Sequence, residues 1–249
     1  MQLRFFARTM VLICFLAQPC FADVLITMNI QTDAIEELEV PAAEQTHTTW
    51  LGENKMREDS GRKSTIIDID AKKLFIIDHA RRSYFAFDLP LDIMANVPEH
   101  MRAELEEMLS SVKIDVEVTP TDESKVINGY QSKKYVISVG GSNIIRQTRN
   151  QWMTEDVGFD IGSFKNMMTQ LLSIQPVGAE WLQQIWAIDG FPVLAETTLE
   201  VSGRQVRTKE ELVSIEEKSP AAGTYAPPAG YSEEEFDFLR MMQQQGAGG

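Results

Sequence analysis

Hydrophobic and polar positions alternate with a period of two through much of the chain, most strongly between residues 64 and 89. Runs of β-branched and aromatic residues lie there at 64–70, 74–78 and 83–89, with short charged segments between them. Such residues fit a pleated, half-buried surface, and Asp favours turns. Connections of about four residues are too short for a parallel crossover, so the runs are predicted to pair as an antiparallel meander.

Further strands are predicted on both sides of this meander, and Asn128-Gly129 marks a hairpin between two of them. These strands cover residues 24–31, 45–51, 55–59, 114–118, 130–139, 144–154, 193–201 and 205–216. Apolar residues recur at helical spacing in 98–112 and in a later pair of short segments, which are expected to form an apolar helical hairpin. The periodic residues of that hairpin are Phe164, Met167, Met168, Leu171 and Leu172, then Trp181, Leu182, Ile185 and Trp186.

This order of elements predicts an α+β fold. We expect a strongly curved antiparallel sheet, a half-barrel of roughly eight to eleven strands, with helices packed on its concave face. Residues 23–231 are expected to form a single domain, because no Pro/Gly/Ser linker is long enough to separate two cores. Residues 232–249 are expected to form a short C-terminal helix, started by the capping-box pair Ser232 and Glu235, and a disordered tail.

Residues 1–22 are predicted to be a secretory signal peptide that is cut after Ala22. Arg4 and Arg8 precede a short apolar run, and the segment ends in a small-x-small pattern, as such signals do. The apolar run is too short to span a bilayer. A lipid-modified Cys20 is the alternative, but the two residues before it are not the small ones of a lipoprotein signal. We therefore expect a periplasmic protein without a transmembrane segment.

Composition narrows the possible functions. The sequence has 23 basic and 37 acidic residues, a formal net charge of −14, and loss of Arg4 and Arg8 with the signal peptide makes the mature chain more acidic. A field of that sign repels phosphate backbones, so nucleic acid is not an expected partner. Both cysteines, Cys14 and Cys20, lie in the signal peptide, so the mature chain has no disulfide, thiol nucleophile or cysteine-ligated zinc.

No complete catalytic or metal-binding set is visible, so we expect neither an enzyme nor a cofactor. The sequence lacks a Gly-x-Ser-x-Gly nucleophile elbow, a phosphate loop and a His-Glu-x-x-His pair. His47 is expected on a sheet surface and His79 in a solvated turn. His100 and Glu104 are four residues apart on a predicted helix, where an exposed i,i+4 pair is commoner than a metal site. The carboxylates that match no calcium loop, and are expected to be structural, are Asp68, Asp70 and Asp78.

Three stretches of the chain resemble secreted bacterial proteins of unknown function. They are Ile127-Asn-Gly-Tyr130 with Lys134-Tyr135, Trp152-Met-Thr-Glu-Asp156, and Gly190-Phe-Pro-Val193 with Pro227-Pro-Ala-Gly-Tyr231. Those proteins are similar in layout to the periplasmic lipoprotein-carrier (LolA-like) superfamily, and the resemblance covers roughly residues 23–231. It implies a curved antiparallel half-barrel closed by helices, with an apolar cavity between them. It assigns no ligand contact to any single residue.

The apolar helical hairpin suggests a function through its residue types. Met153, Met167 and Met168 lie near Phe164 and two tryptophans in sequence, and methionine is common where a surface must fit varied apolar partners. An ordinary core is an equal alternative, because periodicity does not distinguish the two. The favoured hypothesis is a non-catalytic periplasmic protein that binds or carries a lipid or acylated ligand, such as lipoprotein acyl chains. The alternative is a structural or sensory envelope protein that binds a partner polypeptide and no lipid.

A ligand is predicted to lie between the helical hairpin and the meander, because the hairpin is the most apolar stretch of the mature chain. Only one parity of each strand can face inward, so part of the sheet set is expected to face away. The predicted contacts are Phe164, Met168, Leu171, Trp181, Leu182 and Ile185 from the hairpin, and Phe75, Ile77, Phe85 and Phe87 from the sheet.

Overall fold

The computed structural model describes residues 23–34, 41–92, 94, 97–111, 114–141, 145–172, 179–201 and 204–236. The predicted signal peptide and the end of the chain after residue 236 lie outside these ranges. The strands are β1 (Asp23–Thr32), β2 (Ala43–Leu51), β3 (Lys55–Ser60), β4 (Lys63–Asp68), β5 (Lys73–Asp78), β6 (Ser83–Asp88), β7 (Ile114–Ile127), β8 (Tyr130–Gly141), β9 (Ile145–Thr154), β10 (Phe191–Val201), β11 (Arg204–Lys218) and β12 (Ser232–Glu233). The helices are α1 (Glu99–Ser111), α2 (Ile161–Leu172) and α3 (Ala179–Trp186).

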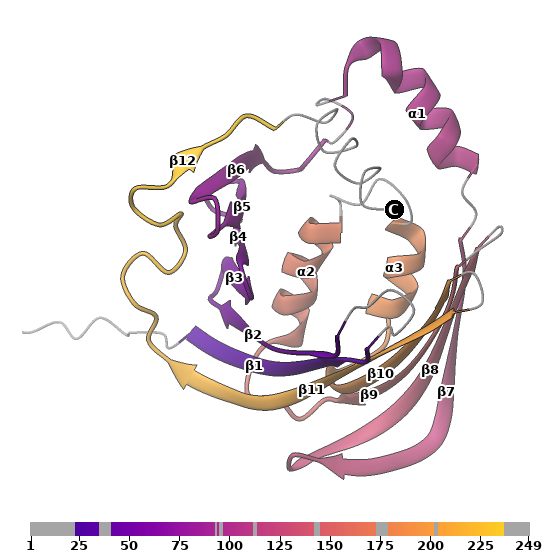
Figure 1. Ribbon diagram of the computed structural model, residues 1–249. Helices are drawn as coiled ribbons and strands as arrows, with labels where there is room; N and C mark the ends of the chain where they lie inside the picture. The colour runs from indigo at the N-terminus through magenta and orange to yellow at the C-terminus, as the bar shows by residue number, and fades with distance from the viewer. Residues whose placement is uncertain are drawn as a thin grey trace, which may run out of the picture.

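All strands of the described ranges belong to one open sheet of twelve strands, in the order β12-β6-β5-β4-β3-β2-β1-β11-β10-β9-β8-β7. Neighbouring strands are antiparallel, except that β12 runs parallel to β6. The sheet is thus two consecutive meanders, β1–β6 and β7–β11, which are joined where β1 pairs with β11 (Figure 1). The predicted mostly antiparallel sheet, including the meander of β4, β5 and β6, is confirmed. The short strand β12 takes the number of strands past the expected range.

Turn chemistry explains why these strands reverse where they do. Asn128 and Gly129 both have positive φ angles, 48° and 90°, as a two-residue hairpin between β7 and β8 requires. Asp78 starts the turn between β5 and β6, because its Oδ1 accepts the N–H groups of Ala80 and Arg81 at 2.9 and 3.0 Å. This is the turn-starting role that the strand-ending position of Asp78 predicts.

The sheet has two different faces. One face of β1–β6 carries Ile26, Met56 and Leu74, which form a single buried cluster with Phe164 and Met167 of α2. We call this the helix face, and Figure 1 shows the sheet bending around α2 and α3. Helix α1 is different, since it packs in a separate small cluster with Phe236 that contains no strand residue.

Residues 219–236, which we call the strap, cross the opposite face of β3–β6 and then pass the β6 edge, so that Phe236 packs against the helix-face cluster (Figure 1). Arg57 Nη1 donates to the carbonyl oxygen of Thr224 at 3.0 Å, and the Tyr225 hydroxyl donates to the carboxylate of Asp23. Burial, together with this hydrogen bond to Asp23, raises the pKa of Tyr225. The strap therefore fastens the C-terminal part of the chain to the first strands of the sheet.

The end of the strap differs from the sequence-based prediction. Ser232 and Glu233 form β12 instead of a helix N-terminus, because the Ser232 N–H donates to Arg82 O at 3.1 Å and the Glu234 N–H donates to Tyr84 O at 2.8 Å. These backbone bonds to β6 compete with the local capping-box pattern, and the tertiary contact prevails. Residues 234–236 are not helical either, and the remainder of the predicted C-terminal helix lies outside the described ranges.

Gly190 offers a test of how the chain enters β10. Its φ is 97°, and a Cβ atom there would lie 2.6 Å from the carbonyl oxygen of Thr154. A Gly190→Ala variant should lose stability by the roughly 1–3 kcal/mol of a strained left-handed residue and by more because the Thr154 backbone must shift. Gly129→Ala is the matched control, since Gly129 also has positive φ but open space around its Cβ position. Equal losses in urea unfolding of both variants would show that the Thr154 contact is unimportant.

The cluster beneath the strap predicts a specific pH dependence. Burial by itself would raise the pKa of Asp59, but hydrogen bonds from Arg57 and Ser64 and the charge of Arg57 outweigh burial and lower it. The ionised Asp59 therefore stabilises the fold above the unfolded-state pKa of about 3.9, and this stability is lost as pH falls through the lower folded-state value. In thermal melts from pH 6 down to pH 2, Asp59→Asn should flatten the acid limb of melting temperature against pH. An acid limb as steep as that of the unmodified protein would contradict this assignment.

Candidate apolar site on the helix face

The N-terminus of α2 is fixed by Asp160, which caps the helix. Asp160 Oδ1 accepts the Gly162 N–H at 2.9 Å, and its Oδ2 accepts the Ser163 hydroxyl at 2.7 Å. These two hydrogen bonds lower the pKa of the Asp160 carboxyl. An aspartate in this position satisfies donors that the first helical turn leaves unpaired. The cap thereby sets the rotation of α2 that turns Phe164 and Met167 to the sheet.

Three aromatic rings surround the ring of Phe164. The ring of Phe164 lies 6.2 Å from Phe159, 5.3 Å from Phe191 and 6.0 Å from Trp186, each in an edge-to-face arrangement. These rings come from the segment before α2, from β10 and from α3. Edge-to-face pairs are favourable beyond the area that they bury, so the group ties both helices to the sheet.

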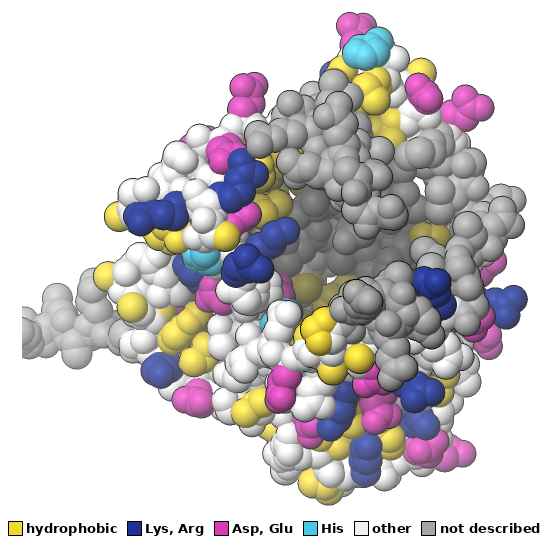
Figure 2. All heavy atoms as spheres, in the orientation of Figure 1, with side chains coloured by type: hydrophobic (Ala, Val, Ile, Leu, Met, Phe, Trp, Pro, Cys, Tyr) yellow, Lys and Arg dark blue, Asp and Glu magenta, His cyan; other side chains and the backbone are white. Residues whose placement is uncertain are grey.

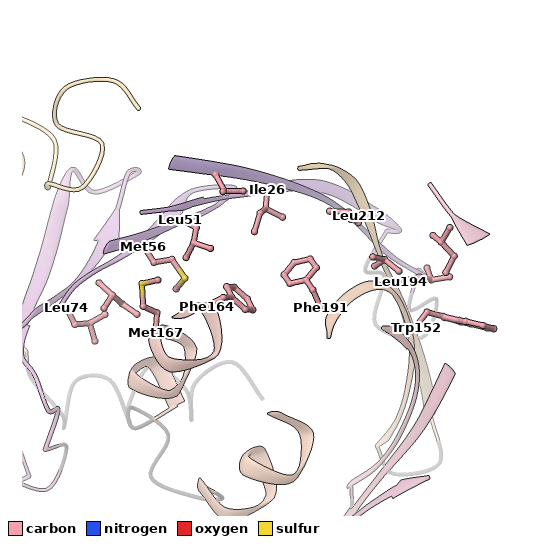
Figure 3. Packing of buried hydrophobic residues seen from close by; sticks show 14 of the residues in the cluster. Ile26, Leu51, Met56, Leu74, Trp152, Phe164, Met167, Phe191, Leu194 and Leu212 are labelled. Carbon is pink, nitrogen blue, oxygen red and sulfur yellow. The ribbon is translucent and has the colours of Figure 1, made fainter. Parts of the chain in front are cut away.

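Below this aromatic group, α2 contacts the first meander. Figure 3 shows Met167 beside Met56 and Leu74, with Phe164 and Phe191 pointing into the same interior. Met167, Met56 and Leu74 are almost completely buried, whereas the next residue, Met168, is only partly buried against the same cluster. Of the two neighbouring methionines of α2, Met167 is therefore part of the core, and Met168 is partly accessible to solvent.

A second aromatic group lies at the β6 edge of the sheet. The ring of Phe236 is 5.8 Å from Phe85 and 5.2 Å from Phe87. All three rings lie near the part of β6 that does not pair with β12. A groove of about 470 Å³ is lined here by Ala86 and Phe87 of β6 and by residues 233–236 of the strap. In Figure 2, hydrophobic and charged side chains of the described residues border part of a hollow at the centre of the molecule.

The structure brings part of the predicted ligand set together. Phe85, Phe87, Phe164 and Met168 belong to or pack against one cluster on the helix face. Ile185 packs instead with Ile137, Met153 and Ile188, in a cluster between α3 and the β7–β9 strands. The helix positions whose side chains lie outside the described part of the structure are Leu171, Trp181 and Leu182.

Phe75 and Ile77 lie on the other face of β5. They alternate with Leu74 and Ile76, which point to the helix face, so strand geometry turns them to the strap. The Phe75 ring contacts Tyr84 at 6.0 Å, and Ile77 is fully buried on that face. These two residues are thus in a position to stabilise the sheet under the strap, away from the helices.

Several members of the site are missing from the sequence-based set. Phe159 and Phe191 lie just outside the predicted helix and strand, and Phe236 belongs to the predicted C-terminal helix and not to the predicted site. The sequence signals for Phe191 are the Asp189-Gly190 turn before it and the Gly190-Phe-Pro-Val193 stretch of the family resemblance. Their membership depends on contacts between elements far apart in the chain, which local patterns do not encode.

A buried polar group under the strap resembles a nucleophile and its base, but its geometry is that of an anchor. Ser64 Oγ lies 2.6 Å from His79 Nε2, and His79 Nδ1 lies 3.0 Å from the Tyr231 hydroxyl. Asp59 accepts the hydrogen bond of Ser64 and does not orient the histidine as a triad aspartate would. Ser64 is almost fully buried. His79, expected in a solvated turn, therefore connects the sheet to the strap.

Among the described residues, no group of three or more His, Cys, Asp or Glu side chains is close enough together to hold a metal ion. No helix in the described ranges is long and apolar enough to cross a membrane.

A family model described as Domain of unknown function (DUF4412) matches residues 35–231. The chain belongs to the DUF4412 family. The resemblance to a family of unknown function is thereby confirmed, and the match spans β2 to β11 and all three helices of this DUF4412 chain. No curated protein matches it.

Solved structures similar to the DUF4412 chain match it weakly. PNGF-II is 15% identical with a TM-score of 0.37, and the match covers 89% of this chain and 32% of PNGF-II. MucB is 11% identical with a TM-score of 0.32, over 85% of this chain and 59% of MucB. A putative outer membrane lipoprotein-sorting protein domain from Vibrio parahaemolyticus is 7% identical with a TM-score of 0.28, over 79% and 85% of the two chains. The DUF4412 chain spans about a third of PNGF-II, and at such TM-scores no function is transferred.

The two neighbouring methionines of α2 test which part of this surface is core. Met167→Ala should destabilise the protein by about 2–5 kcal/mol, as large-to-small changes at closely packed positions do. Met168→Ala should cost clearly less, because its side chain already contacts solvent. Asn166→Ala, at an exposed position of the same helix, is the control and should stay within about 0.5 kcal/mol. Equal losses for Met167→Ala and Met168→Ala in urea unfolding would mean that both sides of α2 are ordinary core.

Proposed function

We propose that this DUF4412 protein is a non-catalytic periplasmic protein that binds or carries a lipid or acylated ligand on the helix face. In this proposal the bent sheet acts as a half-barrel, α2 and α3 lie on its concave face, and acyl chains lie along the accessible side of α2. The signal peptide predicted at residues 1–22 would deliver the chain to the periplasm. No cofactor is required.

The observation that carries the proposal is the half-accessible apolar surface of α2 and its neighbours. Met168, Phe85, Phe159 and Trp186 pack against the buried cluster yet keep part of their surface open. Large apolar surfaces that stay accessible on a protein often bind a ligand or partner, and these partly exposed side chains supply the groups for such a surface. Methionine and aromatic rings adapt to flexible hydrocarbon chains, so acyl groups are the ligand class that best fits.

The groove beside β12 favours a second candidate, an envelope protein that binds a partner polypeptide. β12 covers only the first two residues of β6, and the groove lined by Ala86 and Phe87 follows directly along that edge. A sheet edge next to a groove is the geometry that receives an extended peptide as an added strand, and this groove is lined by Phe87 together with Glu233, Glu234 and Glu235. This candidate needs no lipid.

Binding of the uncharged fluorescent probe N-phenylnaphthylamine tests the lipid hypothesis. Met168→Glu should weaken probe binding by at least about tenfold, because a carboxylate would enter the apolar contact surface. Asn166→Glu adds the same charge two residues away at an exposed position and should leave binding unchanged. Both variants should melt at similar temperatures.

Organic extraction of protein purified from its own envelope separates the two candidates. Co-purified lipid detected by mass spectrometry supports the carrier. A bound polypeptide without lipid, together with equal probe binding by Met168→Glu and Asn166→Glu, would refute the carrier and support the second candidate.

A further inference from the structure

A group of charged side chains lies on the helix face, at the end of the sheet away from the buried cluster. They are His47 of β2, Glu58 of β3, Arg149 of β9 and Glu210 of β11. An even number of positions separates His47 from Leu51, Glu58 from Met56 and Glu210 from Leu212, so each pair shares a face of its strand. All three apolar residues belong to the helix-face cluster. His47, expected on a plain sheet surface, therefore faces the same interior as α2.

Arg149 is fully engaged. Its Nη1 and Nη2 donate to the two carboxylate oxygens of Glu210 at 3.0 and 2.9 Å, and Nη1 also donates to Thr197 Oγ1 at 3.2 Å. Its Nε donates to Gln151 Oε1 at 2.6 Å. A bidentate pair of this kind is geometrically saturated, so Arg149 has little capacity left to receive an anion.

Glu58 is the opposite case. Its nearest charged partner is His47, whose Nδ1 lies 3.8 Å away, and the described part of the chain offers it no side-chain hydrogen bond. Burial raises the pKa of Glu58; His47 lowers it, and the charges of Asp59 and Glu210 raise it further. β3 and β11, which carry Glu58 and Glu210, are separated by β2 and β1 in the sheet, and both side chains are on the helix face.

The group is also accessible. The exposed fractions of the side chains are 35% for Glu58, 22% for His47, 29% for Glu210 and 19% for Arg149. A half-buried carboxylate without a hydrogen-bonding partner is unfavourable, and a second carboxylate nearby makes it more so. Apart from His47, this group has two carboxylates and only one guanidinium beside an apolar surface.

We propose that this group binds the positively charged end of an amphipathic ligand, with Glu58 as the counter-ion of an ammonium group. The inference rests on the proposed function, since the ligand's hydrocarbon chain would lie on the apolar part of the helix face. An ammonium group supplies the hydrogen bonds and charge that Glu58 lacks, in surroundings that screen charge less than bulk water. The ligand class is therefore an aminolipid or another long-chain amine.

Three ligands with the same twelve-carbon chain test the charge preference: dodecylamine, dodecanol and dodecanoate. Each competes with bound N-phenylnaphthylamine at pH 7.5, below its own micelle-forming concentration. Dodecylamine should displace the probe at a concentration about tenfold or more lower than dodecanol, and dodecanoate should be the weakest.

Glu58→Gln should abolish the preference for dodecylamine and leave displacement by dodecanol unchanged, while Glu58→Asp should keep part of it. Glu196→Gln is the matched control, because Glu196 is an exposed carboxylate on β10 that alternates with the helix-face residues Ala195 and Thr197. It removes the same charge from the other face and should retain the full preference. Thermal melts confirm that each variant is folded.

The outcomes separate this inference from the proposed function. Equal displacement by all three ligands, unaffected by Glu58→Gln, overturns the ammonium site and leaves the lipid-binding proposal standing. A preference for dodecanoate also overturns it, since Arg149 would then be the group that interacts with the charged end of the ligand. Failure of the probe and of dodecanol and dodecylamine to bind at all, checked by calorimetry, refutes both.

Discussion

The antiparallel pairing of β1 with β11 is the contact on which the rest of the structure depends. Residues 23–32 and 204–218 lie at opposite ends of the described chain, and their pairing joins two local meanders into one sheet. A β-bulge opposite Thr27 and Met28 adjusts the register so that Leu212 shares a face with Ile26 and Met28. This junction places apolar residues of both meanders, such as Ile26 and Leu212, in one cluster with Phe164 and Met167 of α2.

Different interactions stabilise the two faces of the joined sheet. The strap face is tied by polar contacts from Arg57 and His79 to a strap that follows the last long strand, so the C-terminal segment closes over the first meander. The helix face is held by rings and thioethers around Phe164 and Met167, which pack without directional bonds. Side chains of that kind rearrange more readily than a hydrogen-bonded network, so adaptability is concentrated on the helix face.

Charge inside the curve of the sheet gives the helix face a second property. Arg149 and Glu210 neutralise each other through a bidentate pair, while Glu58 is left with a distant histidine. The helix face is thus apolar at one end and carries, at its other end, a carboxylate that lacks a hydrogen-bonding partner among the described side chains. Such a surface distinguishes the two ends of a long ligand, which a uniformly apolar pocket does not.

Much of the fold follows from the sequence. The short connections around Asp78 and the Asn128-Gly129 turn determine that neighbouring strands pair in an antiparallel way, because too few residues are present for any other connection. Helical spacing locates α1, α2 and α3, since the period of 3.6 residues is a local property. The capping pattern at Ser232 predicts a helix that does not start there, because backbone hydrogen bonds to β6 outweigh the local preference.

The candidate site follows from the sequence only in part. Alternation shows that Leu74 and Ile77 point in opposite directions, but both are apolar and both are fully buried, so the pattern alone does not tell which one faces α2. That choice depends on where α2 and the strap lie, which long-range packing decides. For the same reason Phe191, Phe236 and Glu58 joined the site only in three dimensions. The amino-acid sequence by itself determined the elements and their local pairing; the tertiary structure decided which face became the site, because a face is defined by what covers it.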